Sequence, residues 1–397
     1  MLSNDTEIYI LYYGTLNSKD GSNTHIIELA KNMANKVPLK LFVMNSKRQD
    51  FDENYIYWVP VLHVKNFATL SYEIFLSFMM LRFMLHKKPR IVYIRQDSIS
   101  FLPLILCKLI GIPSVVEVNG LINDEIDVVS KFSIKKVFLS LSIASASFNC
   151  KHCNRIITVT QNIKEELSKR YNIPGSKIHV INNGANIDLF RPMITQKAKR
   201  ELNLDVCKSH VCFVGNLAPW QGVEYLIQAS PSILEKEPDT TFLIVGDGIL
   251  KEKLITLADS LNVSRNYIFT GSVPYEQVSM YINACEVCVV PKRPLKSGYS
   301  PLKLYEYMAC GKPVIASRVD GFEVLEQINS GLLVNPEDSK EFSTAILQLL
   351  SDPYLREKMG FNGRNYVQKS QSWKAVSEKV LDVCEDLLNL RLQKKQL

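Results

Sequence analysis

The sequence lacks the long apolar run that a membrane-spanning helix needs. Its longest apolar stretches, 74–85 and 101–118, are interrupted by Arg82 and Lys108, and neither offers about 18 uninterrupted apolar residues. Acidic residues precede the first apolar run, where a secretory signal would carry Lys or Arg. We therefore expect a cytoplasmic protein without a spanning helix.

Several nucleotide and nucleophile motifs are also missing. No GxGxxG follows the first predicted strand, which argues against a dinucleotide oxidoreductase. Neither a P-loop nor a GxSxG elbow is present, which argues against P-loop enzymes and α/β-hydrolases.

Metal-binding patterns are weak. The two CxxC pairs, 150–153 and 285–288, are separated by roughly 130 residues and lie in a predicted helix end and a predicted buried strand, so a zinc site is a minor alternative. The one DxD, at 50–52, follows Lys47 and Arg48 in a polar loop and is interpreted as surface charge. Nine cysteines, most of them in apolar surroundings, favour reduced thiols. We expect neither a metal nor a cofactor.

Charge is divided unevenly along the chain. The net charge is +7, and residues 1–185 hold 22 Lys plus Arg against 15 Asp plus Glu, whereas the remainder holds 25 of each. A basic half is typical of a protein that meets nucleic acid, a phosphorylated substrate or an anionic membrane. Solubility alone explains the excess equally well.

The 397 residues predict two domains in which strands and helices alternate. Short apolar runs without strict alternation indicate buried parallel strands covered by helices on both faces. The predicted strands of the first half are 7–13, 39–44, 90–95, 113–120 and 155–160, and those of the second half are 210–215, 241–248, 267–272, 286–291 and 312–317.

The stretch 182–206 has no strong strand and is interpreted as the linker. We therefore predict an α/β protein with two doubly wound, Rossmann-like domains, at 1–190 and 191–367, and a terminal region, 368–397, that is helical from Trp373. Open parallel sheets bind ligands at the carboxyl ends of their strands, so we expect the site in a crevice between the domains.

The most informative motif is GYSPLKLYEYMACGKPVIAS at 298–317. Ser300 and Pro301 predict a helix start, with Ser300 as N-cap, and such a start binds phosphate. Lys303 adds a cation in the first turn, and Glu306 lies on the same helix face. Together they suit the diphosphate and ribose of a nucleotide, although an ordinary surface pair has the same spacing.

This motif, together with FVGNLAPWQGVEYLIQA (213–229), IVGDG (244–248), FTGSVP (269–274) and INNGANIDLFRP (181–192), resembles glycosyltransferase family 4 in order and spacing. These are retaining, nucleotide-sugar-dependent enzymes of the GT-B fold. The resemblance covers most of the chain. It implies that the first domain binds the acceptor, that the second binds the nucleotide sugar, and that the last helix packs back on the first domain.

The resemblance assigns Glu306 to the ribose. The family's preceding Glu is replaced here by Gly298, and the Arg and Lys that follow Gly215 in many relatives are replaced by Asn216 and Gln221. The diphosphate then needs another cation, first Lys303 and otherwise Lys292 or Arg293. The implied nucleotide-binding set is Gly21, Gly215, Asn216, Gln221, Gly248, Ser272, Val273, Ser300, Leu302, Lys303 and Glu306.

Asn119 takes the place of a His that in relatives lies over the donor sugar, with Glu117 and Glu125 as acidic companions. An Asn is no general base, but in this family a leaving phosphate oxygen can take the acceptor's proton. The predicted catalytic residues are Asn119, Lys303 and Glu306; a plain turn at Asn119–Gly120 is the alternative. His25 is predicted to begin a helix. A single His at a helix start is more often a polar capping residue than a catalytic one.

Residues 126–151 are apolar and carry Lys131, Lys135, Lys136 and Lys151. They suit either an interfacial segment on lipid headgroups or a core helix with a solvated fringe.

We therefore expect a metal-independent retaining hexosyltransferase (EC 2.4) without nucleic-acid binding. Its partners would be a nucleotide-diphosphate sugar and a glycan or lipid-linked acceptor for surface polysaccharide, at the inner face of the membrane. The alternatives are an inert nucleotide-sugar-binding partner subunit and a transferase with a small soluble acceptor. Donor base, sugar, acceptor and linkage stay open.

Overall fold

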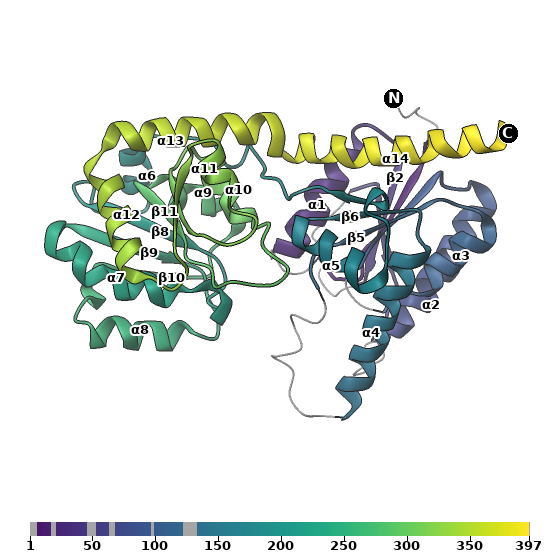
Figure 1. Cartoon of the computed structure of the whole chain (residues 1–397), viewed down its shortest axis with the longest axis horizontal. Helices are drawn as coiled ribbons and strands as arrows, with labels where there is room; N and C mark the ends of the chain where they lie inside the picture. The colour runs from purple at the N-terminus through teal and green to yellow at the C-terminus, as the bar shows by residue number, and fades with distance from the viewer. Residues whose placement is uncertain are drawn as a thin grey trace. The chain divides into compact units, whose positions relative to one another are not determined.

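The computed structural model describes residues 6–16, 21–45, 53–62, 68–96, 99–121 and 133–396. The chain divides into two compact units. Unit 1 comprises Met1–Asn182 and Lys374–Leu397, and unit 2 comprises Asn183–Trp373 (Figure 1). The DFD sequence at 50–52 lies outside the described residues.

Unit 1 is built on one parallel sheet with the order β3-β2-β1-β4-β5-β6-β7. Its first strands are buried because their side chains are apolar on both faces. The strands are β1 (Ile8–Leu11), β2 (Leu39–Met44), β3 (Ile56–Val59), β4 (Ile91–Arg95), β5 (Ser114–Val118), β6 (Arg155–Thr158) and β7 (Ile178–Val180).

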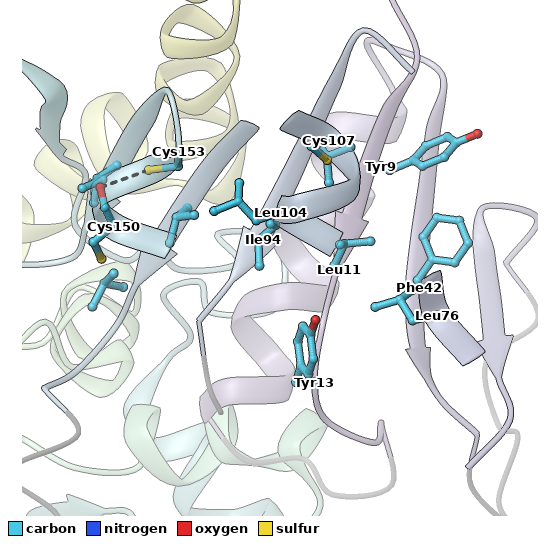
Figure 2. Packing of buried hydrophobic residues seen from close by; sticks show 14 of the residues in the cluster. Tyr9, Leu11, Tyr13, Phe42, Leu76, Ile94, Leu104, Cys107, Cys150 and Cys153 are labelled. Atoms are coloured by element: carbon cyan, nitrogen blue, oxygen red, sulfur yellow. Dashed lines mark hydrogen bonds between the residues drawn. The ribbon is translucent and has the colours of Figure 1, made fainter. Parts of the chain in front are cut away.

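The helices of unit 1 cover this sheet. They are α1 (Gly21–Ala34), α2 (Ala68–His86), α3 (Leu102–Ile110), α4 (Ser133–His152), α5 (Gln161–Tyr171) and α14 (Trp373–Gln396), with a short turn η2 (Gly175–Lys177). Figure 2 shows the buried cluster between sheet and helices, in which Phe42 of β2 lies beside Leu76 of α2, and Ile94 of β4 lies beside Leu104 of α3.

Helix α2 is, among the described helices, the one whose length and composition would allow it to cross a membrane. A third of its apolar window, 33%, is buried. The buried part includes Tyr72, Leu76, Met80 and Met84, which recur every four residues and pack into the cluster of Figure 2. One face of α2 is therefore a core face of unit 1.

Unit 2 repeats the design with a parallel sheet of order β10-β9-β8-β11-β12-β13. Cys212 belongs to one apolar cluster and its neighbours Val211 and Phe213 to another, because alternate side chains of a strand point to opposite faces. The strands are β8 (Ser209–Val214), β9 (Thr240–Val245), β10 (Tyr267–Gly271), β11 (Val287–Val290), β12 (Val314–Ser317) and β13 (Gly331–Val334).

The helices of unit 2 lie between and after these strands. They are α6 (Thr195–Glu201), α7 (Val223–Lys236), α8 (Lys251–Ser260), α9 (Tyr275–Asn283), α10 (Leu302–Ala309), α11 (Val324–Gln327), α12 (Ser339–Ser351) and α13 (Pro353–Tyr366), with short turns η3 (Pro219–Gln221), η4 (Ser264–Asn266) and η5 (Val367–Gln371).

The ten predicted strands agree with ten observed ones, but β3, β7 and β13 were not predicted. β7 has three residues, and β13 is partly exposed in its middle. β3 is partly exposed at three of its four residues. Edge strands of this kind lack the continuous apolar run that marks a buried strand.

The unit borders lie elsewhere than predicted. Unit 2 starts at Asn183 rather than at 191 and extends to Trp373 rather than 367. The Arg364 guanidinium donates to the carbonyls of Ile187, Phe190 and Ala309, at 3.3, 2.8 and 2.8 Å. Ala185 exchanges backbone hydrogen bonds with Gln371 and Trp373. These bonds hold residues 183–190 and 367–373 in unit 2.

We predict that Arg364→Met lowers the free energy of unfolding of unit 2 by about 2–3 kcal/mol, because three partly buried carbonyls lose a charged donor. The matched control is Arg318→Gln. Arg318 pairs with Glu326 at 2.7 Å, but both side chains are about half exposed, so its loss should cost less than about 1 kcal/mol. Urea unfolding measures both. Equal effects would contradict the role given to Arg364.

Candidate active site

The site of unit 2 lies where the sheet order reverses. β8 is flanked by β9 on one side and by β11 on the other, so the connections after β8 and β11 leave in opposite directions. Such a switch point opens a crevice at the carboxyl ends of the strands. Gly215 directly follows β8, and Lys292 follows β11. Both residues therefore belong to this crevice.

Lys303, in the first turn of α10, reaches this point. Its Nζ donates to Oε1 of Gln221 at 3.0 Å and lies 4.2 Å from the ring centroid of Phe213. Gly215 has a φ of +143°, and a Cβ there would overlap the Lys303 ammonium. Burial, and then the neighbouring charge of Lys292, lower the pKa of Lys303 well below its usual value.

Lys292 is the second cation of this group. Its side chain is buried, with Nζ 4.5 Å from the ring centroid of Tyr299. Burial lowers the pKa of Lys292 to about 7. Arg293, which the sequence offered alongside Lys292, is exposed and paired with Glu224 at 2.7 Å. The cations that can meet a buried anion are therefore Lys303 and Lys292.

The start of α10 differs from the prediction. The helix begins at Leu302 with Pro301 at the N-cap position and no capping side chain, so Ser300 is not the N-cap. The Ser300 hydroxyl instead accepts the backbone N–H of Asn183 at 2.9 Å, and its carbonyl accepts the Asn183 amide at 2.6 Å. The uncapped N–H groups of the first turn remain suited to an anion.

Glu306 lies one turn further along α10 and is only 5% exposed. Its Oε1 accepts a hydrogen bond of 2.8 Å from the hydroxyl of Tyr275, the first residue of α9. A buried carboxylate at this place can accept hydrogen bonds from neighbouring hydroxyl groups of a ligand. Gly298, at the position where the resemblance implied a Glu, has a φ of +63° and provides no side chain.

The other predicted residues of unit 2 surround this group at the strand ends. Asn216 is exposed and lies against Gly248, where a Cβ would overlap its Oδ1. Ser272 is exposed after β10, whereas Val273 packs partly into the core. Leu302 is partly buried at the start of α10.

In unit 1, Asn119 directly follows β5. Both polar atoms of its amide are buried, and neither has a hydrogen-bond partner among the residues that the structure describes. Because an unpaired buried amide costs about 1–3 kcal/mol, such a group is suited to a ligand. Glu125, the predicted companion, lies outside the described residues.

His25 does not begin its helix, as was predicted, but lies in the second turn of α1. Its Nε2 is 2.7 Å from Oε1 of Glu117, and both side chains are buried. Although burial acts in the opposite direction, His25, Arg95 and Tyr93 together hold the pKa of Glu117 below its usual value. His25 is thus half of a buried pair rather than a capping residue.

Arg95 and Tyr12 contact the first turn of α1. Its guanidinium donates to the Ser22 carbonyl at 3.0 Å and to the Ser22 hydroxyl at 2.9 Å. The Tyr12 hydroxyl donates to Asn23 at 2.6 Å. These bonds fix the first turn of α1 behind the exposed Gly21.

Sequence reasoning missed Tyr275, Arg95 and Tyr12. Tyr275 directly follows the predicted motif at 269–274, whereas Tyr12 and Arg95 lie at the ends of the predicted strands 7–13 and 90–95. Arg95 is the last residue of β4, beside the switch point of the first sheet. A charged residue at the end of a buried strand was the available signal.

The two CxxC pairs belong to different units: Cys150 and Cys153 lie in unit 1, and Cys285 and Cys288 lie in unit 2. Within the described ranges, no group of three or more His, Cys, Asp or Glu could hold a metal ion. Lys131 lies outside these ranges, as do the side chains of Lys135 and Lys136, so the predicted membrane contact of 126–151 stays a prediction.

Two family models match the chain in succession. "Glycosyltransferase Family 4" matches residues 19–189, and "Glycosyl transferases group 1" matches residues 195–366. Together they span most of both units. The chain belongs to the family 4, group 1 glycosyltransferases and has their GT-B fold.

Two curated relatives show the range of similarity. An uncharacterized glycosyltransferase of Methanocaldococcus jannaschii is 30% identical, over 58% of this chain and 59% of that protein. The α-D-kanosaminyltransferase of Streptomyces kanamyceticus is 24% identical, over 74% and 75%. The match thus spans about three fifths of the first relative and three quarters of the second.

Solved structures share the fold at low identity. A sucrose-phosphate synthase from Thermosynechococcus elongatus has a TM-score of 0.77 at 20% identity, covering 97% of this chain and all of that one. WaaG, a glycosyltransferase of lipopolysaccharide biosynthesis, has 0.73 at 17%, covering 95% and 99%. HepE of Anabaena, in complex with UDP and glucose, has 0.71 at 16%, covering 96% and 99%.

We predict that the Lys292 ammonium titrates with a midpoint near pH 7, because burial disfavours its charged form. The ¹³Cε resonance that Lys292→Met removes from labelled protein identifies the group. Sulfate should raise the midpoint, since a bound anion stabilises the charged amine. The assignment fails if the resonance lost in Lys292→Met does not titrate between pH 6 and 8.

Proposed function

We propose that this glycosyltransferase moves a sugar, with retention, from a nucleotide-diphosphate sugar to a hydroxyl acceptor. The observation that carries the proposal is the grouping of Lys303, Lys292 and Glu306 around the carboxyl end of β8 and the start of α10. HepE, which shares the fold, was solved with UDP and glucose.

The proposed binding mode follows from charge. The diphosphate lies against the uncapped start of α10, where Lys303 and Lys292 supply two ammonium groups and Gly215 lets the backbone approach. Glu306 accepts the ribose hydroxyls, and Tyr275 orients its carboxylate. Lys303 thereby replaces the cations that are missing at Asn216 and Gln221.

The proposed chemistry needs no metal ion. Negative charge grows on the diphosphate as the glycosidic bond breaks, and the two lysines stabilise that charge. A leaving phosphate oxygen takes the acceptor's proton as the new bond forms on the same face. Asn119 is neutral and serves to orient hydroxyl groups of sugar or acceptor with its unpartnered amide.

We further propose that the acceptor is lipid-linked and that the protein works in the cytoplasm, at the inner face of the membrane, in surface polysaccharide synthesis. WaaG, of the same fold, acts in lipopolysaccharide biosynthesis. The competing acceptor class is a small soluble molecule, which the name of the sucrose-phosphate synthase illustrates. Transfer assays with a lipid-linked and a water-soluble acceptor distinguish the two classes.

We predict that Glu306→Gln weakens nucleoside diphosphate binding by about 1.5–3 kcal/mol, because the ribose loses a charged acceptor. Calorimetry with UDP, GDP and ADP measures the loss and identifies the base. Glu326→Gln, an exposed carboxylate in the same unit, is the control and should bind normally. A folded Glu306→Gln protein with unchanged affinity would exclude the ribose role.

We predict that Lys303→Ala lowers turnover by roughly 10²-fold or more, with a smaller loss of donor binding, because the ammonium acts most on the developing charge. Release of nucleoside diphosphate from the donor measures turnover, also without a known acceptor, and Lys340→Ala is the exposed control. If Lys303→Ala stays active while Lys292→Ala does not, Lys292 is the principal cation. An inert partner subunit would release no nucleotide with any donor.

A further inference from the structure

Helix α2 carries a second apolar face that the core of unit 1 does not use. Its exposed apolar side chains recur along the helix opposite the buried ones. Helix α3 lies beside α2 (Figure 1) and carries a similar row of exposed apolar side chains. The exposed residues are Leu70, Ile74, Phe75, Phe78, Leu81 and Leu85 of α2 and Leu102, Ile105 and Leu109 of α3. We call these residues the α2–α3 face.

The two rows enclose a shallow groove of about 290 Å³. Seven of the eight residues that line it are apolar, and Ser77 is the eighth. Glu73 joins the two helices from the core side, where its Oε1 accepts the backbone N–H of Leu102 at 2.6 Å. The α2–α3 face is therefore a built, continuous apolar surface and not a scatter of single side chains.

Charge around this face has one sign. Within the described part of 68–111, the exposed charged side chains near it are Arg82, Lys87, Lys88, Arg90 and Lys108, and the single acid, Glu73, is buried. Arg391 of α14 adds a cation at the end of α3, where it donates to the Gly111 carbonyl at 2.8 Å. An apolar surface edged by cations is complementary to the acyl chains and headgroups of an anionic bilayer.

We propose that the α2–α3 face is the membrane-binding surface of the protein. The apolar side chains enter the interfacial layer of an anionic bilayer while the surrounding Lys and Arg meet its headgroups. Helix α2 lies in the interface and does not span it, because Tyr72, Leu76, Met80 and Met84 belong to the core of unit 1. The biological purpose of this surface rests on the proposed function, but its binding to vesicles is tested independently of turnover.

The test is flotation of the full-length protein with vesicles of phosphatidylcholine containing 30% phosphatidylglycerol and with pure phosphatidylcholine vesicles, at low and high salt. The protein should bind the anionic vesicles at low salt and leave them as salt rises. Phe78→Gln with Leu109→Gln should lower the partition coefficient by ten- to a hundredfold, since each side chain contributes about tenfold on entering lipid.

The control is Ile249→Gln with Phe361→Gln in unit 2. Ile249 and Phe361 are 81% and 68% exposed, the same exposed fractions as Leu109 and Phe78. The control therefore removes equally exposed apolar side chains from another part of the protein. The control should bind vesicles normally. In a second arm, Lys87→Gln, Lys88→Gln and Lys108→Gln together should remove the preference for anionic vesicles.

Three results would overturn the proposal. The first is no binding of the unmodified protein to anionic vesicles at low salt. The second is loss of binding only when Lys131, Lys135 and Lys136 are replaced by Gln, which would place the contact in 126–151. The third is a dimer in light scattering that Phe78→Gln with Leu109→Gln converts to a monomer, which would assign the face to a second copy. Nucleotide affinity, measured on each variant, reports separately on the proposed transferase site.

Discussion

The ammonium of Lys303 is the group on which the unit-2 site depends. It is held by the neutral amide of Gln221 above the ring of Phe213, and neither contact neutralises a positive charge. The space it occupies requires glycine at 215, and its amide partner requires the short turn η3 to present Gln221. A bound anion would supply the negative charge that neither Gln221 nor Phe213 provides to the Lys303 ammonium.

The two units have the same sheet reversal but carry different polar groups beside it. Both sheets reverse their order next to the first strand, and both gather polar side chains at that point. In unit 2 the group is cationic. In unit 1 the group includes the pair of His25 and Glu117, the bonds of Arg95 to Ser22, and Asn119, whose amide has no described partner. A rigid network beside one unpaired amide is suited to orienting hydroxyl groups.

Much of this could be predicted from the sequence because buried parallel strands have a strong local signal. The runs at 41–44 and 242–245 are apolar on both faces, and the spacing of the SPLKLYE motif predicts Lys303 and Glu306 on one helix face. Edge strands such as Ile178–Val180 carried no such signal. Local patterns do not encode contacts between residues that are distant in the chain. Such contacts determine the border at Asn183, the cap at Pro301 and the role of Tyr275.

The lowered pKa values of Lys292 and Lys303 also describe the resting state of the site. Because burial disfavours the charged form of both amines, the crevice attracts anions less strongly than two fully charged ammonium groups would. In the proposed binding mode, a bound diphosphate favours the charged form of both amines, so protons are taken up as it binds and released as it leaves. Binding in this mode is coupled to proton exchange, and its heat includes the ionisation enthalpy of the buffer.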